Sequence, residues 1–165
     1  MILFIIFVIL FLILVNAFYV AAEFAAVSVR RNMIREMAEG GSKVAAHLLR
    51  ILENTKELDR YIAACQFGIT ISSLILGAYG QVELSAYLLP LFERFGGMDS
   101  VMANSVAAIV VLVVLTVLQV ILGELMPKSL ALQFPKQAAL YTYYPMRWTL
   151  TFFAWFIDFL NGSGL

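Results

Sequence analysis

The first 22 residues, MILFIIFVILFLILVNAFYVAA (1–22), contain no charged side chain. A helix needs about 20 consecutive apolar residues to cross the hydrocarbon core of a bilayer, so this stretch is long enough to span it. A cleavable signal peptide would begin with basic residues and contain a shorter apolar run of about 7–15 residues. We therefore expect a retained transmembrane helix here.

Two further uncharged runs, residues 61–82 and 101–123, are about as long as the first. The chain of 165 residues is 62% hydrophobic and only 13% charged, with a mean hydropathy of +0.91. A soluble domain is about a quarter charged, so this chain could not cover a water-exposed surface of its own size. We predict an all-α membrane protein in which residues 1–165 form a single transmembrane domain with three spanning helices.

Composition also excludes several classes of protein. Eleven basic residues balance eleven acidic ones, whereas a nucleic-acid-binding protein needs a clustered basic surplus. The single cysteine, Cys65, excludes an intrachain disulfide framework and a cysteine-based zinc site. No pair of side chains resembles a nucleophile and its base, so we do not expect an enzyme.

The distribution of basic residues predicts the orientation. The loop between the second and third runs carries only Arg94, whereas the loop between the first two carries seven basic residues: Arg30, Arg31, Arg35, Lys43, Arg50, Lys56 and Arg60. Basic residues concentrate in cytoplasmic loops. We expect a plasma-membrane protein with the N-terminus outside, this first loop inside and the C-terminus in the cytoplasm.

This basic loop is predicted to be helical. Residues 30–39 and 43–54 place apolar side chains at helical spacing, Gly40-Gly41 separates them, and Ser42 is a suitable N-cap. We expect a cytoplasmic hairpin of two amphipathic helices. His47 lies in the second helix, where a surface or partly packed histidine is favoured over a metal ligand because no second His or Cys accompanies it.

A fourth stretch, residues 137–160, differs from the three uncharged runs. Pro145 and Arg147 interrupt it, and it contains nine aromatic residues. Aromatic rings at this density favour the membrane–water interface. We expect a C-terminal juxtamembrane helix that lies partly in the interface, with a short fourth span as the alternative.

Acidic residues at membrane depth are costly and mark functional sites, and three qualify: Glu23, Glu83 and Glu124. Glu83 lies near the external end of the second run, where reaching the headgroups is the simpler explanation. Pro127 lacks an N–H, so a helix through it would kink and leave the Gly123 carbonyl bare beside the Glu124 carboxylate. Transporters build cation sites from such groups at broken helices. The alternative is that Pro127 merely ends the third helix and Glu124 pairs with Lys128 one turn later.

Small residues line one face of the first run at spacings of 4, 4 and 3: Ala17, Ala21, Ala25 and Ser28. Such stripes allow close helix packing, which is their commoner use, and the second run is similarly rich in glycine and serine. If these faces meet, the oxygens of Ser28, of Ser72 or Ser73, and of Gly123 and Glu124 converge. An all-oxygen site of this kind favours magnesium or calcium over zinc or copper.

Three strings occur in order along the chain: NAFYVAAEFAAVSVRR (16–31), ACQFGITISSLILG (64–77) and GELMPK (123–128). Together they resemble the signature of the cyclin M/CorC family of magnesium transporters. The resemblance covers essentially the whole chain and implies three spanning helices, a cytoplasmic helical hairpin and a C-terminal juxtamembrane helix.

The resemblance also implies a function. Family members form homodimers in the bilayer and move Mg²⁺ outward, with Na⁺ as the proposed coupling ion, and cytoplasmic CBS-type domains that bind ATP would follow residue 165. The motif positions imply four Mg²⁺ ligands: Ser28, Ser72, Gly123 and Glu124. Less certain neighbours of that site are Ser73, Asn104 and Glu23.

A second hypothesis is a dimeric membrane anchor or Mg²⁺ sensor that transports nothing and passes a signal to attached cytoplasmic domains. The aromatic stretch near the C-terminus favours this hypothesis, because an interfacial helix there is placed to move an attached module. A sensor would bind Mg²⁺ without carrying it across the membrane, which distinguishes the two hypotheses.

Overall fold

The computed structural model describes residues 1–96 and 99–153, and every regular element in these ranges is helical, which confirms the all-α prediction. The helices follow one another along the chain as α1 (Ile2–Ser28), α2 (Arg31–Glu39), α3 (Lys43–Glu53), α4 (Thr55–Gly96), α5 (Ser100–Leu118), the π-helix η1 (Gln119–Leu125), α6 (Met126–Gln133) and α7 (Pro135–Phe152).

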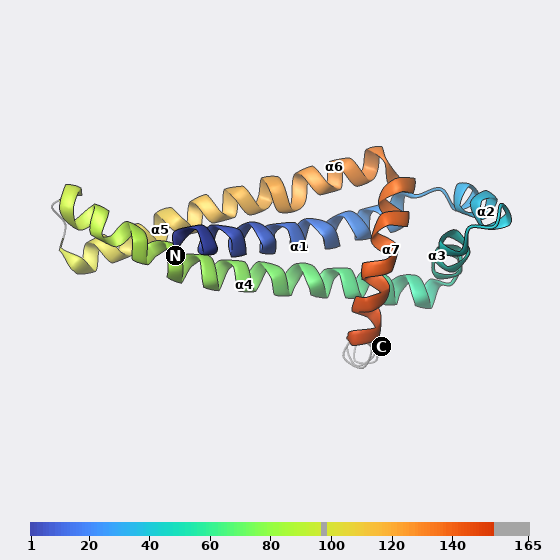
Figure 1. The fold of residues 1–165 in the computed structure, drawn as a ribbon, viewed down its shortest axis with the longest axis horizontal. Helices are drawn as coiled ribbons and strands as arrows, with labels where there is room; N and C mark the ends of the chain where they lie inside the picture. Colours follow the sequence, from blue (N-terminus) through green and yellow to red (C-terminus); the bar gives the residue numbers. More distant parts are fainter. Residues whose placement is uncertain (97–98, 154–165) are drawn as a thin grey trace.

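Three long helical segments lie side by side and form the body of the molecule (Figure 1). They are α1, α4 and the continuous helix formed by α5, η1 and α6, and each is long and apolar enough to cross a membrane. This confirms the three predicted spans. Their ends differ from the predicted ones, because α4 continues for 42 residues through Pro90 and, with α5, projects beyond the N-terminus of α1.

The predicted helical hairpin is present as α2 and α3. The Ser42 hydroxyl accepts a hydrogen bond from the Ala45 amide at 3.3 Å, so Ser42 caps α3 as expected. Ile34 of α2 and Leu48 of α3 are buried. The hairpin is also closed by an ion pair between Arg35 and Glu53, whose hydrogen bond and charge raise the pKa of the Arg35 guanidinium above its ordinary value.

Helix α7 lies across the ends of α1 and α4 rather than alongside them (Figure 1). It buries Ala139, Tyr143 and Met146 against the bundle, while Tyr144 and Trp148 are exposed. Among the described residues α7 is not a candidate span, and its position at the membrane interface stays a prediction. The part of that prediction that concerns residues 154–160 lies outside the described residues.

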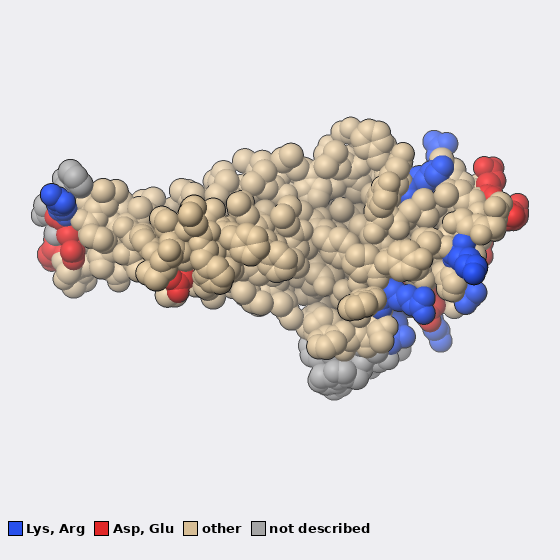
Figure 2. Space-filling model, viewed as in Figure 1, with Lys and Arg blue, Asp and Glu red and all other residues tan. Residues whose placement is uncertain are grey.

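Charged side chains are concentrated at the two ends of the molecule (Figure 2). Lys and Arg gather at the end formed by α2, α3 and the start of α4, whereas the middle of the visible face is almost uncharged. The distribution is that of a protein whose apolar middle lies in a bilayer. Which end faces the cytoplasm stays a prediction.

Two apolar clusters hold the three long segments together. The first, called here the isoleucine cluster, consists of Ile5, Ile9, Ile13, Leu76, Val111 and Leu115. The second, called the alanine cluster, lies nearer α7 and includes Ala22, Ala25, Ala26, Ala64, Ala131 and Ala139. Between these two clusters each segment contributes polar or glycine residues to one shared layer, which forms the candidate site: Asn16 of α1, Ser72 and Ser73 of α4, and Gln119 and Gly123 of η1.

Candidate ion-binding site

Asn16 is the centre of a buried polar layer between the two apolar clusters. Its side chain is fully buried, at 0% exposure. Its Nδ2 atom donates to the Gly123 carbonyl oxygen at 3.1 Å, and its Oδ1 atom accepts from the hydroxyls of Ser72 at 2.9 Å and Ser73 at 3.1 Å. One amide therefore links α1, α4 and η1 at membrane depth.

Gln119 extends the same network. Its Nε2 atom donates to the Ser73 hydroxyl at 2.6 Å. Ser72 also donates to the backbone carbonyl of Gly68 at 2.8 Å, one turn earlier in α4. We call the whole set the polar layer: Asn16, Ser72, Ser73, Gln119 and Gly123.

The third segment does not kink at Pro127 in the way that the sequence predicts. It widens into the π-helix η1 and continues as α6, with Pro127 in the first turn of α6. The Gly123 carbonyl is not bare, since the Asn16 amide donates to it, so that prediction was wrong. A Cβ atom at Gly123 would lie 3.1 Å from Asn16 Nδ2, so glycine permits this close approach.

Glu124 follows Gly123 in η1 and is partly buried. Its carboxylate forms no hydrogen bond or ion pair with the part of the chain that the structure describes. The alternative pairing with Lys128 is not formed, because the Lys128 ammonium lies 4.6 Å from the centre of the Phe24 ring. Glu124 therefore follows Gly123 directly in the chain, and its carboxylate has no partner among the described residues.

The other predicted site residues are not brought together with the polar layer. Ser28 lies twelve residues after Asn16, about 18 Å along α1 at 1.5 Å per residue, and its hydroxyl donates to the Phe24 carbonyl. Glu23 accepts from Gln66 Nε2 at 3.4 Å, and Asn104 is exposed near the start of α5. The structure thus joins Ser72, Ser73 and Gly123, and it separates Ser28, Glu23 and Asn104 from them. Glu124 adjoins this group only through Gly123, its neighbour in the chain.

Two residues of the polar layer, Asn16 and Gln119, were not predicted as site residues. Each leaves a signal in the sequence. Asn16 interrupts an otherwise apolar stretch, and Gln119 is the last polar side chain before Gly123 in the third run. A buried amide within a membrane needs partners for both its donor and its acceptor, so either residue predicts a polar contact between helices.

The polar layer offers ligands of one chemical kind. The groups that could bind a cation are two amide oxygens, two hydroxyls and a backbone carbonyl, and Glu124 is the next residue after Gly123 in η1. These hard oxygen ligands suit Mg²⁺ or Ca²⁺. No three His, Cys, Asp or Glu side chains gather anywhere in the described ranges to hold a metal. The arrangement therefore favours a weakly held, hydrated hard cation over a tightly bound transition metal.

Comparison with known proteins identifies the family. Residues 7–164 match the family described as "Cyclin M transmembrane N-terminal domain". The chain belongs to this family. The resemblance expected from the three sequence motifs is thereby confirmed, and this cyclin M domain is a membrane protein with three helices capable of spanning.

Several curated relatives share most of the domain. The UPF0053 proteins YrkA and YhdT of Bacillus subtilis (strain 168) are 37% and 40% identical to it, each over 152 residues that make up 92% of this chain. The "Polyamine export protein" of Haemophilus influenzae is 26% identical over 152 residues. The alignments cover 34%, 32% and 34% of these three relatives, so the chain spans about a third of their length.

Proposed function

We propose that this cyclin M domain carries Mg²⁺ out of the cytoplasm, with inward movement of Na⁺ as the driving force. The observation that supports the proposal is the polar layer, where oxygens of three helices meet at the fully buried Asn16. Mg²⁺ requires an octahedron of oxygens at about 2.0–2.1 Å and keeps several waters, so a few protein ligands are sufficient. Glu124 supplies the negative charge.

A transport cycle would have to break some of the hydrogen bonds that Asn16 forms. Asn16 now points its N–H group at the Gly123 carbonyl, and an N–H cannot bind a cation. Binding of Mg²⁺ to that carbonyl would require the Asn16 amide to turn away or to present Oδ1, which breaks its bonds to Ser72 and Ser73. The network and the bound cation are thus alternatives, and exchange between them would accompany movement of the three helices.

The apolar clusters on either side of the polar layer would act as closures. The isoleucine cluster packs side chains of α1, α4 and α5 on one side, and the alanine cluster closes the other with help from α7. Alternating access needs one closure to open at a time. We also expect a homodimer and attached cytoplasmic CBS-type domains in the whole protein, and Na⁺ coupling to depend on that assembly.

The test is Mg²⁺ flux in liposomes that contain the purified chain. We expect the Glu124→Gln variant to lose at least about tenfold in flux, since it removes the carboxylate of the residue that follows Gly123, and tenfold corresponds to about 1.4 kcal/mol. Glu83→Gln is the matched control, because Glu83 is also partly buried but lies in α4 beyond the isoleucine cluster. Equal flux in both variants would contradict the site.

A second candidate cargo is a polyamine, which the printed name of one relative favours. Its ammonium groups would donate to the carbonyl, hydroxyl and carboxylate oxygens that we assign to Mg²⁺. Flux of labelled spermidine in the same liposomes distinguishes the two cargoes. Binding of Mg²⁺ without flux of either cation would support the membrane-sensor alternative instead.

A further inference from the structure

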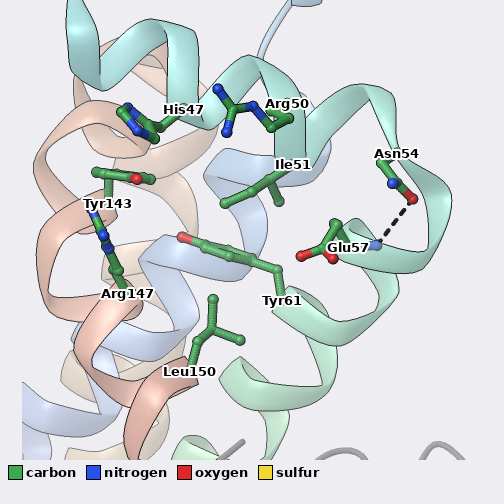
Figure 3. Close-up of a pocket in the computed structure, with 9 residues that line it drawn as sticks. All are labelled: His47, Arg50, Ile51, Asn54, Glu57, Tyr61, Tyr143, Arg147 and Leu150. Atoms are coloured by element: carbon green, nitrogen blue, oxygen red, sulfur yellow. Dashed lines mark hydrogen bonds between the residues drawn. The ribbon is translucent and has the colours of Figure 1, made fainter.

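A cavity lies at the basic end of the molecule, away from the polar layer. It has a volume of about 350 Å³ and is enclosed by α3, the first turns of α4 and α7 (Figure 3). Arg50 comes from α3, Tyr61 from α4 and Arg147 from α7, so the cavity joins three elements that are distant in the sequence. Nothing in the proposed transport function uses it.

The cavity carries an excess of positive charge. Neither the Arg50 nor the Arg147 guanidinium forms an ion pair with any residue that the structure describes. His47 also lines the cavity. Its Nδ1 atom is 2.7 Å from the Lys43 carbonyl and therefore donates to it.

One acidic side chain, Glu57, also lines the cavity, so two arginines face one carboxylate. The start of α4 is not the source of attraction for an anion. Its first amides are already used, because Asn54 Oδ1 accepts from the amides of Lys56 at 3.0 Å and Glu57 at 3.4 Å. Any anion here would be held by the side chains of Arg50 and Arg147.

The position of the cavity points to the source of that anion. Tyr144, Trp148 and Phe152 are exposed on α7, the same helix that supplies Arg147. Exposed aromatic residues of this kind lie at the level of lipid headgroups. The cavity wall also includes Ile51 and Leu150, which suit the apolar part of a lipid next to its phosphate.

We propose that this cavity binds a phosphate ester, supplied by an anionic phospholipid of the leaflet that α7 contacts, with Arg50 and Arg147 as its ligands. Arginine pairs with phosphate through two parallel N–H···O bonds, and anionic lipids attract basic residues at the membrane surface. A headgroup in this position bridges the hairpin helix α3 and the interfacial helix α7. It would therefore fix the hairpin against the bundle.

The experiment measures binding of phosphatidylglycerol to the purified full chain in zwitterionic nanodiscs, by native mass spectrometry and by competition. We expect the double variant Arg50→Gln/Arg147→Gln to bind about tenfold more weakly, because two charge-assisted contacts are lost. The double variant Arg50→Lys/Arg147→Lys keeps the charges but not the paired bonds, and should fall between the two. Both arginines are exposed, so the fold should survive.

The matched control is Arg30→Gln/Arg31→Gln, which removes the same charge from two exposed positions outside the cavity. Binding in this control should stay within about twofold of the parent chain, because general surface attraction is shared among many residues. An equal loss in both glutamine variants, or none in either, would overturn the proposal. Soluble glycerol phosphate that binds as tightly as the lipid would overturn the lipid as source.

Discussion

The polar layer and the isoleucine cluster lie next to each other on the same three helical segments, and they are built in opposite ways. In the isoleucine cluster Leu76 and Leu115 are almost completely buried and the contacts are apolar. One turn further along, Ser72 and Gln119 replace them, and the contacts are hydrogen bonds to Asn16 and Ser73. Apolar packing holds the helices together in the first region, and hydrogen bonds hold them together in the second. We propose that a cation replaces some of these hydrogen bonds when it binds.

The two regions of the bundle therefore serve different purposes, one mainly stability and the other mainly function. Lipid is as apolar as leucine, so packing of the isoleucine cluster stabilises through close contact rather than through exclusion of water. The polar layer must instead pair its donors and acceptors with one another, because the surrounding hydrocarbon offers them no hydrogen bonds. Substitutions in the first region should therefore change mainly the free energy of unfolding, whereas those in the second should change cation binding as well.

The largest expected effect on stability comes from the isoleucine cluster. Leu76→Ala should lower the free energy of unfolding by about 2–4 kcal/mol, since it opens a cavity at a completely buried position. Leu74→Ala is the matched control, because Leu74 is 66% exposed, and it should be close to neutral. Unfolding in mixed detergent micelles measures both. Similar losses in the two variants would show that the cluster is not a packed core.

A smaller effect is expected where glycine permits the contact with Asn16. In Gly123→Ala the new methyl group would lie 3.1 Å from Asn16 Nδ2 and displace the amide from the Gly123 carbonyl. We expect Mg²⁺ affinity to change by about tenfold, which is about 1.4 kcal/mol. Gly77→Ala should leave affinity unchanged, because no heavy atom lies within 4 Å of a Cβ there. Calorimetric titration with Mg²⁺ compares the two, and equal affinities would exclude Gly123 from the site.

The smallest effect sharpens the comparison at a single hydroxyl. Ser73→Ala should cost about 1 kcal/mol in unfolding, because it removes the link between Gln119 and Asn16. The control is Thr116→Val, whose hydroxyl donates only to the Leu112 carbonyl of its own helix and should matter less than about 0.5 kcal/mol. If Thr116→Val lowers the free energy of unfolding more than Ser73→Ala does, the hydrogen bonds between helices in this layer contribute no extra stability.

The spans and the hairpin could be predicted because single physical requirements impose them. A long run without charges is forced into the bilayer as a helix, and Ser42 after Gly40-Gly41 starts a new helix. The full length of α4 could not be predicted from hydropathy. Outside the bilayer, charged residues no longer end a helix, so α4 extends from Thr55 to Gly96.

The site was predicted only in part, because residue spacing gives the face of a helix and not the depth in the membrane. The small-residue stripe from Ala17 to Ser28 does share a face, but it runs along α1, so Ser28 lies about 18 Å from Asn16. The π-helix also changes the expectation, since an extra residue per turn rotates the face that Glu124 presents. Neither the depth of a residue along a helix nor the wider turn of η1 produces a recognisable spacing of residues in the sequence.

The central claim is that the polar layer around Asn16 binds the transported cation. The most direct test is Mg²⁺ binding by the purified chain with Asn16→Leu, compared with Ile13→Leu one turn away in the isoleucine cluster. We predict that Asn16→Leu lowers affinity by at least about tenfold, equivalent to about 1.4 kcal/mol, while Ile13→Leu leaves it unchanged. Unchanged Mg²⁺ affinity in a folded Asn16→Leu protein would contradict the account.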